Sequence, residues 1–165
     1  MGNSKNVVAP SLLRNTTLFH LHSIRLCLGI RKGKHMPSVF TLIINGELPG
    51  HCLWKDDICV SFLTINPLTP GHSLIVPIEE TDHWLDLPDT TNKHLMGIAS
   101  IIGKAQMDVY RPNRIGQIIA GFEVPHTHLH VLPIWTMRDL EFSQNPAVAD
   151  QAELAKNAER LRSSL

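Results

Sequence analysis

Apolar residues form short runs along this chain, and residues that favour turns bound each run. Runs of this length, rich in apolar and β-branched side chains, are typical of β-strands. Two of them flank the polar triplet from Lys55 to Asp57 and therefore predict a hairpin. The segments that we interpret as strands are 51–54, 58–65, 73–78, 114–119 and 126–133.

One longer segment repeats its apolar residues at intervals of three and four, which is the spacing of one face of an α-helix. Asp89 or Thr90 can cap the start of this helix. Its predicted buried stripe contains Leu95, Ile98, Ile101, Ile102 and Ala105. A short helical turn is expected over residues 82–87, whereas the apolar segment 38–44 fits either a helix or a strand.

A last helix is predicted over residues 146–162, because Asn145 suits a helix cap and Pro146 suits the first turn. Its predicted inner stripe contains Val148, Ala152, Ala155, Ala158 and Leu161. Since most of these side chains are small, we expect the helix to pack closely on the body of the protein or on a partner subunit. Strands and helices in this order predict an α+β fold.

Composition favours one globular domain with a basic leader. The chain has 165 residues, of which 43% are hydrophobic, and this suffices for a single core. No apolar run approaches the roughly 20 residues that span a bilayer. Residues 1–35 hold six Lys or Arg and no acidic residue, which leaves nine basic and fifteen acidic residues in the rest. This acidic body argues against nonspecific nucleic-acid binding, and we expect neither a nucleic acid nor a membrane as partner.

The leader allows three interpretations: an organellar transit segment, translated upstream sequence ahead of a natural start at Met36, or a solvated and partly helical tail. We therefore divide the chain into an extension (1–35), which we expect to be disordered or not native, a domain (36–140) and a C-terminal segment with a helix (141–165). The chain has an odd number of cysteines without paired metal spacing, namely Cys27, Cys52 and Cys59. This favours a reducing, cytoplasmic setting, or organellar import if the leader is native.

The densest chemistry lies in the last predicted strand. Strand alternation would place His126, His128 and His130 on one face. Three interpretations of such a cluster are open. It can act in catalysis as nucleophile, acid, base or phosphate-binding group, or it can bind a metal. The third interpretation is that the histidines are merely polar residues on a half-buried strand. The preceding segment, Gly121 to Pro125, is typical of a phosphate cradle, and a fourth histidine, His72, follows the turn that begins at Asn66.

The segment His126-Thr127-His128-Leu129-His130-Val131-Leu132 resembles the signature of the histidine triad nucleotide-binding family. Residues 39–49, the turn at 66–72 and the Ala120-Gly121 pair also match, so that the resemblance runs from about residue 36 to 135. It implies a five-stranded, mostly antiparallel sheet with one long and several short helices, of which 38–44 would be one. It also implies a homodimer whose two sheets join.

The resemblance further implies a nucleotide hydrolase or nucleotidyl transferase. His128 would attack the α-phosphate of a nucleoside phosphoramidate or a dinucleoside polyphosphate, and a nucleotidyl-histidine would then release a nucleoside monophosphate. Three other histidines would position and stabilise the phosphate: His72, His126 and His130 in its neutral or protonated form. The base and ribose would contact Phe40, Ile43, Leu48, Phe62 and Ile65.

Several family positions differ here. Thr64 replaces an acidic residue or asparagine that often binds the ribose, and Phe122 and Glu123 replace a glutamine and a small hydroxyl residue. Backbone near Glu123 and Val124 would contact the phosphate. Ser38 and Thr41 stand where some bacterial relatives have a zinc-binding cysteine pair, and we expect no metal and no cofactor. Two alternatives stay open: a nucleotide sensor or scaffold with little turnover, and a metal protein that uses the same histidines.

Overall fold

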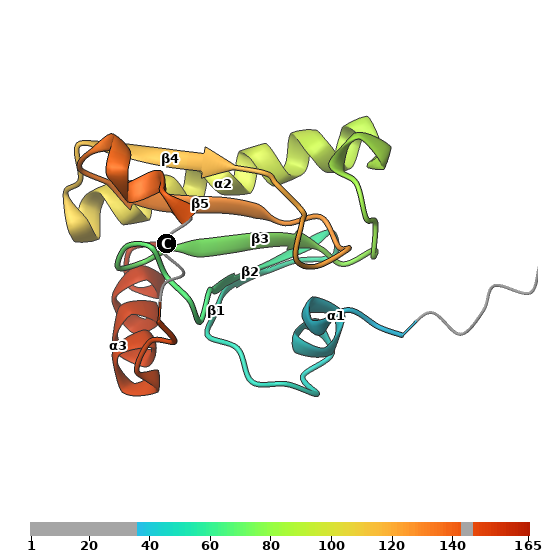
Figure 1. The fold of residues 1–165 in the computed structure, drawn as a ribbon, viewed down its shortest axis with the longest axis horizontal. Helices are drawn as coiled ribbons and strands as arrows, with labels where there is room; N and C mark the ends of the chain where they lie inside the picture. Colours follow the sequence, from blue (N-terminus) through green and yellow to red (C-terminus); the bar gives the residue numbers. More distant parts are fainter. Residues whose placement is uncertain (1–35, 143–146) are drawn as a thin grey trace, which may run out of the picture. The chain divides into compact units, whose positions relative to one another are not determined.

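The computed structural model describes residues 36–142 and 147–165. Its centre is one five-stranded sheet in the order β1-β2-β3-β5-β4, with every neighbouring pair antiparallel. The strands are β1 (Cys52–Lys55), β2 (Cys59–Leu63), β3 (Ser73–Pro77), β4 (Arg114–Ile118) and β5 (Leu129–Ile134). The α+β sheet architecture predicted from the sequence is confirmed (Figure 1).

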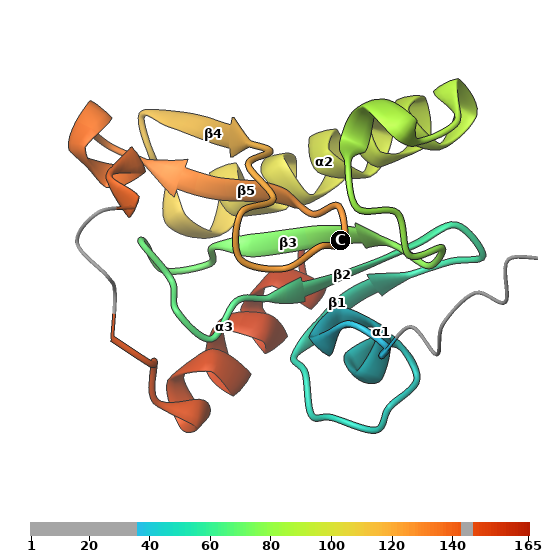
Figure 2. The ribbon, with the colours of Figure 1, turned by 45° about the vertical axis from the view of Figure 1, so that its right-hand side comes forward.

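Helices cover both faces of this sheet. The long helix α2 (Asp89–Tyr110) and the C-terminal helix α3 (Gln151–Arg162) pack with one face, and the short helix α1 (Val39–Ile44) packs with the other. Figure 2 shows α1 in front of the sheet and α2 behind it. Two single turns of 3-10 helix, η1 (Trp84–Asp86) and η2 (Met137–Leu140), complete the described elements. None of the helices in the described ranges is long and apolar enough to cross a membrane.

The alternation of β2 explains why the protein has two apolar clusters. Cys59 and Leu63 point into the larger cluster, where they meet Ile98 and Ile102 of α2. Val60 and Phe62 point the other way, into a smaller cluster that includes Phe40 of α1. Since β2 and β3 are buried along their whole length, the pocket described below rests on a rigid floor.

The long helix differs in detail from its prediction. It begins at Asp89, and the residue at its cap is Pro88, whose side chain makes no capping bond. Ile101 was expected in the buried stripe but is 36% exposed. The helix instead buries Ala99 and Gln106, and the Gln106 amide donates hydrogen bonds to the carbonyls of Gly71 and Val131. A buried glutamine can replace an apolar residue here because the strand backbone offers it partners.

The C-terminal helix begins later than predicted. Asp150 caps it by accepting a hydrogen bond from the Glu153 amide, so the helix runs from Gln151 and not from residue 146. The predicted cap at Asn145-Pro146 lies outside the described residues. The predicted inner stripe is also wrong in three of its five positions: Val148, Ala152 and Ala155 are exposed. The residues that face the protein are Leu154, Asn157, Ala158 and Leu161.

Candidate functional site

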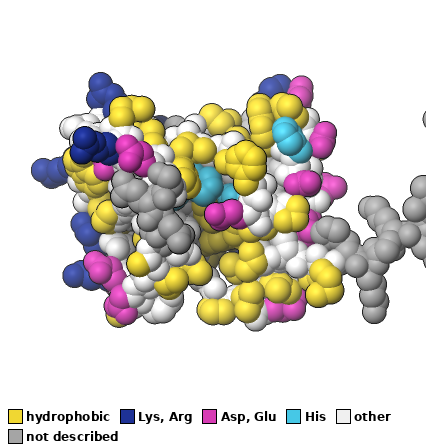
Figure 3. All heavy atoms as spheres, in the orientation of Figure 1, with side chains coloured by type: hydrophobic (Ala, Val, Ile, Leu, Met, Phe, Trp, Pro, Cys, Tyr) yellow, Lys and Arg dark blue, Asp and Glu magenta, His cyan; other side chains and the backbone are white. Residues whose placement is uncertain are grey.

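An apolar cavity of about 460 Å³ opens between α1, the end of β2 and the start of β5. We call it the triad pocket. All eight residues predicted to bind substrate line it: Phe40, Ile43, Leu48, Phe62, Thr64, Ile65, Glu123 and Val124. His128 and His130 line it as well. Histidine side chains reach the surface among hydrophobic ones on the face drawn in Figure 3.

His128 is held in one tautomer by the backbone. Its Nδ1 atom lies 2.7 Å from the carbonyl oxygen of His126, and a carbonyl oxygen can only accept a hydrogen bond. Nδ1 therefore carries a proton, and in the neutral ring Nε2 carries a lone pair. The ring packs edge-on against Phe40 with 4.9 Å between centroids. An oriented imidazole with an unprotonated nitrogen is what a nucleophile requires.

His130 and His72 form a second chain of hydrogen bonds. The Leu68 amide donates to His72 Nδ1, so His72 carries its proton on Nε2 and donates it to His130 Nδ1 across 2.9 Å. A neutral His130 must then carry its own proton on Nε2. Phe142 packs edge-on against both rings. His130 is thereby prepared to donate one hydrogen bond beside His128, whose ring lies 5.0 Å from its own between centroids.

Burial makes this chain electrically neutral. Desolvation and the nearby His130 lower the pKa of His72 to about 3, and desolvation together with His128 lowers the pKa of His130 to about 4. Of the two forms of His130 considered from the sequence, the structure favours the neutral one near pH 7. What His130 offers to a ligand is therefore a directed N–H group, not a full positive charge.

His126 lies behind the pocket and does not line it. The strand β5 begins only at Leu129, so His126 and His128 precede the strand on which they were predicted, and only His130 lies on it. The ring of His126 is fully buried, with Nε2 donating to the carbonyl of Pro77 and Nδ1 accepting from the hydroxyl of Ser38. Burial lowers its pKa despite the partners that favour its charged form. His126 thus fixes the backbone that in turn holds His128.

Ser38 connects this arrangement to α1, and sequence reasoning missed it. Its hydroxyl also accepts the Thr41 amide and so caps α1, while its own amide donates to a carboxylate oxygen of Glu80. The Thr41 hydroxyl donates to the same oxygen. A serine at position 38 with threonine three residues later is a visible capping pattern, but no sequence signal pairs it with a histidine 88 positions away.

Two polar residues that no motif pointed to also line the pocket, namely His51 and Gln151. His51 Nε2 lies 3.1 Å from Oε1 of Gln151, which is the first residue of α3. The C-terminal helix therefore supplies one wall of the pocket mouth. This contact joins residues 100 positions apart and could not be read from spacing.

Comparison with known proteins identifies the family. Residues 45–137, more than half of the chain, match the profile of the HIT domain. The chain belongs to the histidine triad (HIT) family. An uncharacterised HIT-like protein of Borreliella burgdorferi is 37% identical over 102 residues, which cover 58% of this chain and 73% of that protein.

Two other relatives in the family bear on function and fold. An adenosine 5′-monophosphoramidase of Saccharomyces cerevisiae is 34% identical over 96 residues, which cover 58% of this chain and 61% of the enzyme. A crystal structure of a HIT-like protein from Bartonella henselae, described as involved in cell-cycle regulation, superposes with a TM-score of 0.70 at 25% identity. That superposition covers 78% of this chain and 96% of the other.

Proposed function

We propose that this HIT protein is a nucleotide hydrolase or nucleotidyl transferase that acts at the α-phosphate of nucleoside phosphoramidates or dinucleoside polyphosphates. The observation that carries the proposal is the bond between His128 Nδ1 and the His126 carbonyl, which in the neutral ring places the lone pair on Nε2 of a residue that lines the pocket. The name of the yeast relative, adenosine 5′-monophosphoramidase, supports the reaction class.

The proposed reaction has two steps. The lone pair of His128 Nε2 attacks the α-phosphorus, a P–N bond to His128 forms, and the bond from phosphorus to the leaving amine or phosphate breaks. Water then attacks the same phosphorus, the P–N bond to His128 breaks, and a nucleoside monophosphate leaves. The Nε2–H group of His130 would donate to a phosphate oxygen in both steps.

The lining of the pocket supports a nucleotide as ligand. Phe40 and Phe62 present aromatic surface, with 5.7 Å between their ring centroids, and aliphatic side chains surround them. Such a wall suits the base, while the two histidines meet the phosphate. The hydroxyl of Thr64, also in the lining, would contact the ribose.

One observation favours the second candidate, a nucleotide-binding sensor with little turnover. Glu123 lines the pocket that the phosphate would enter, and its carboxylate would repel an anionic group. This candidate and the enzyme use the same pocket, so turnover separates them.

The test measures release of adenosine monophosphate by the full chain from an adenosine phosphoramidate and from a diadenosine polyphosphate, each with and without a chelator. We expect turnover of at least one substrate, unchanged by the chelator, since histidines supply the nucleophile and the hydrogen-bond donor. His128→Gln should be inactive, whereas His83→Gln, which changes an exposed histidine outside the pocket, should be as active as the wild type. Nucleotide binding without turnover would favour the sensor.

We further propose that the protein acts on a small nucleotide in the cytoplasm as a homodimer. The described strand β4 stands at one end of the strand order and has a single neighbour, so its outer edge is available for pairing with a second copy. Sedimentation of the full chain tests this assembly, and a monomer at micromolar concentration would contradict it.

A further inference from the structure

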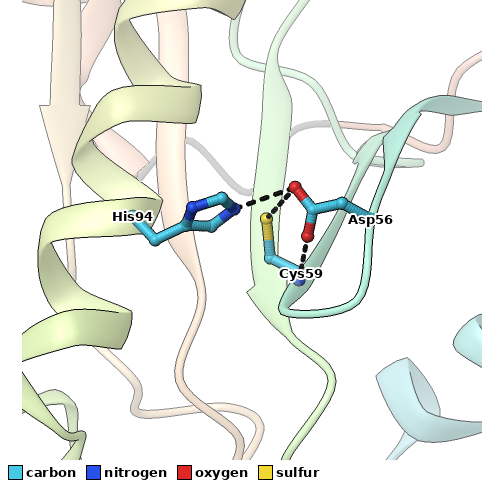
Figure 4. A group of neighbouring side chains, drawn as sticks. All are labelled: Asp56, Cys59 and His94. Atoms are coloured by element: carbon cyan, nitrogen blue, oxygen red, sulfur yellow. Dashed lines mark hydrogen bonds and ion pairs between the residues drawn. The ribbon is translucent and has the colours of Figure 1, made fainter.

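Three side chains with metal-ligating atoms meet on the side of the sheet away from the triad pocket. They are Asp56 in the β1–β2 turn, Cys59 at the start of β2 and His94 in α2 (Figure 4). The three ligand atoms all lie within 4.8 Å of one another. Cys59 belongs to the apolar cluster under α2, whereas Phe40 and Phe62 of the triad pocket belong to the opposite cluster.

The donor set matches one class of ion. A thiol sulfur, an imidazole nitrogen and a carboxylate oxygen are the ligands that Zn²⁺ takes in proteins, and an ion held by three protein ligands, as in catalytic zinc sites, takes a water in the fourth position. A thiolate and a carboxylate balance the two positive charges of the ion, and a neutral imidazole adds none. Such a site would be electrically neutral, which favours it at the edge of an apolar core.

The distances require little rearrangement. His94 Nε2 lies 2.8 Å and Cys59 Sγ lies 3.9 Å from Oδ2 of Asp56. The ligands of a four-coordinate zinc ion are about 3 to 4 Å apart. The thiol is buried, but the side chains of His94 and Asp56 are 32% and 25% exposed, so an ion has access and His94 can move outward.

The surroundings of Asp56 already orient its carboxylate. The amides of Ile58 and Cys59 both donate to Oδ1, and the indole of Trp54 donates to Oδ2. These bonds can persist when Oδ2 binds an ion, and hydrogen bonds of this kind hold metal ligands in place in known sites. Only the His94–Asp56 hydrogen bond and the weak contact from the Cys59 thiol must give way.

We propose that Asp56, Cys59 and His94 form a zinc site that ties the β1–β2 hairpin to α2. On binding, the S–H bond of Cys59 is replaced by an S–Zn bond, and one proton leaves to solvent. The proton on His94 Nε2 moves to Nδ1 by exchange with water, so no second proton is released. This site is separate from the histidine triad and from positions 38 and 41, where we expected no metal.

The experiment titrates the metal-free, reduced full chain with Co²⁺ alone and follows the sulfur-to-cobalt charge-transfer absorption, then repeats the titration with Zn²⁺ in competition. We expect one ion per chain with this absorption. Cys59→Ser should abolish the band, and His94→Gln should weaken binding by more than the roughly 10- to 100-fold that loss of an outer hydrogen-bonding partner costs. Zn²⁺ should also raise the melting temperature of the wild type but not of His94→Gln.

Matched controls assign the sulfur and the nitrogen. Cys52→Ser and Cys27→Ser change the other cysteines, and His83→Gln changes an exposed histidine close in sequence. All three should bind the ion like the wild type. Since Cys59 is buried, its variant is checked for folding by circular dichroism, and the partly exposed His94 gives a second, milder variant. Absence of the band in the wild type, its persistence in Cys59→Ser, or its loss in a control would overturn the proposal.

Discussion

At the scale of single residues, each histidine is assigned a role by its hydrogen-bond partners. His128 donates to a backbone carbonyl and faces the pocket, His130 accepts a hydrogen bond from His72, and His126 is enclosed behind them. The alternation of histidines in the sequence predicted the cluster, but it could not rank its members. Their ranking depends on backbone carbonyls and on Ser38, whose pairing with His126 has no sequence signature.

Ser38 offers a direct test of this arrangement. Ser38→Ala leaves the buried Nδ1 of His126 without the hydroxyl and removes the cap of α1. We expect the free energy of unfolding to fall by about 1–3 kcal/mol. Chemical denaturation measures it, with Ser100→Ala on the exposed face of α2 as control. If Ser38→Ala and Ser100→Ala lowered the free energy of unfolding by the same small amount, the hydrogen bond between Ser38 and His126 would contribute nothing to stability.

We predict that His72 makes the stability of the folded protein depend on pH. Its pKa falls from 6.5 to about 3 on burial, so the unfolded chain binds a proton below pH 6.5 that the folded protein does not bind. Stability is therefore lost as pH falls from 6.5 towards 3, by up to about 1.4 kcal/mol per pH unit for one proton. In His72→Gln, the free energy of unfolding should depend less steeply on pH between about 7 and about 5. If the pH dependence of the free energy of unfolding were the same in His72→Gln, in the control His83→Gln and in the wild type, the lowered pKa of His72 would be refuted.

At the scale of elements, the sequence predicted well which segments form strands and helices, but it predicted less well the residues at which they begin. Asn145-Pro146 is a good cap in isolation, yet α3 starts at Gln151. Residues before it are held by the bond from the Ala149 amide to the Ile65 carbonyl, and Asp150 supplies the cap. Such a contact between distant segments overrides a local signal. The predicted alanine stripe is largely exposed for another reason: a repeated spacing of three residues falls short of the 3.6 residues in a turn, so Ala152 lies on the opposite side of the helix from Leu161.

A matched pair of substitutions tests the observed face of α3. Ala158 is buried in the main cluster and Ala155 is exposed, although both were predicted inside. Ala158→Asp should cost more than about 3 kcal/mol because it buries an unpaired charge. Ala155→Asp should cost less than about 1 kcal/mol. Thermal unfolding of both variants decides, and an equally large loss of stability for both would restore the predicted stripe.

At the scale of the whole molecule, the family resemblance implied a five-stranded, mostly antiparallel sheet, but the strand order β1-β2-β3-β5-β4 was not predicted. The alternation of apolar and polar residues identifies a strand but does not show which strand lies beside it in the sheet. The triad pocket likewise required the fold, since its walls come from residues between Val39 and Gln151. The division of the chain into an extension, a domain and a C-terminal segment stays a prediction.

Removal of residues 1–35 tests that division. The match to the HIT domain starts at residue 45, and the first described helix starts at Val39. A chain that begins at Met36 should melt within about 2 °C of the full chain and turn over substrate equally well. A lower melting temperature or loss of the dimer would show that the extension contributes to the folded protein.

The central claim is that His128 is the nucleophile, and trapping the intermediate tests it most directly. The full chain is mixed with a slowly hydrolysed adenosine phosphoramidate and quenched at alkaline pH, and mass spectrometry with fragmentation locates the label within the triad peptide. We predict adenosine monophosphate on His128 in the wild type, no label in His128→Ala, and turnover of this variant lowered by on the order of 10⁴. A label on His72 or His130, or an active His128→Ala protein, would contradict the account.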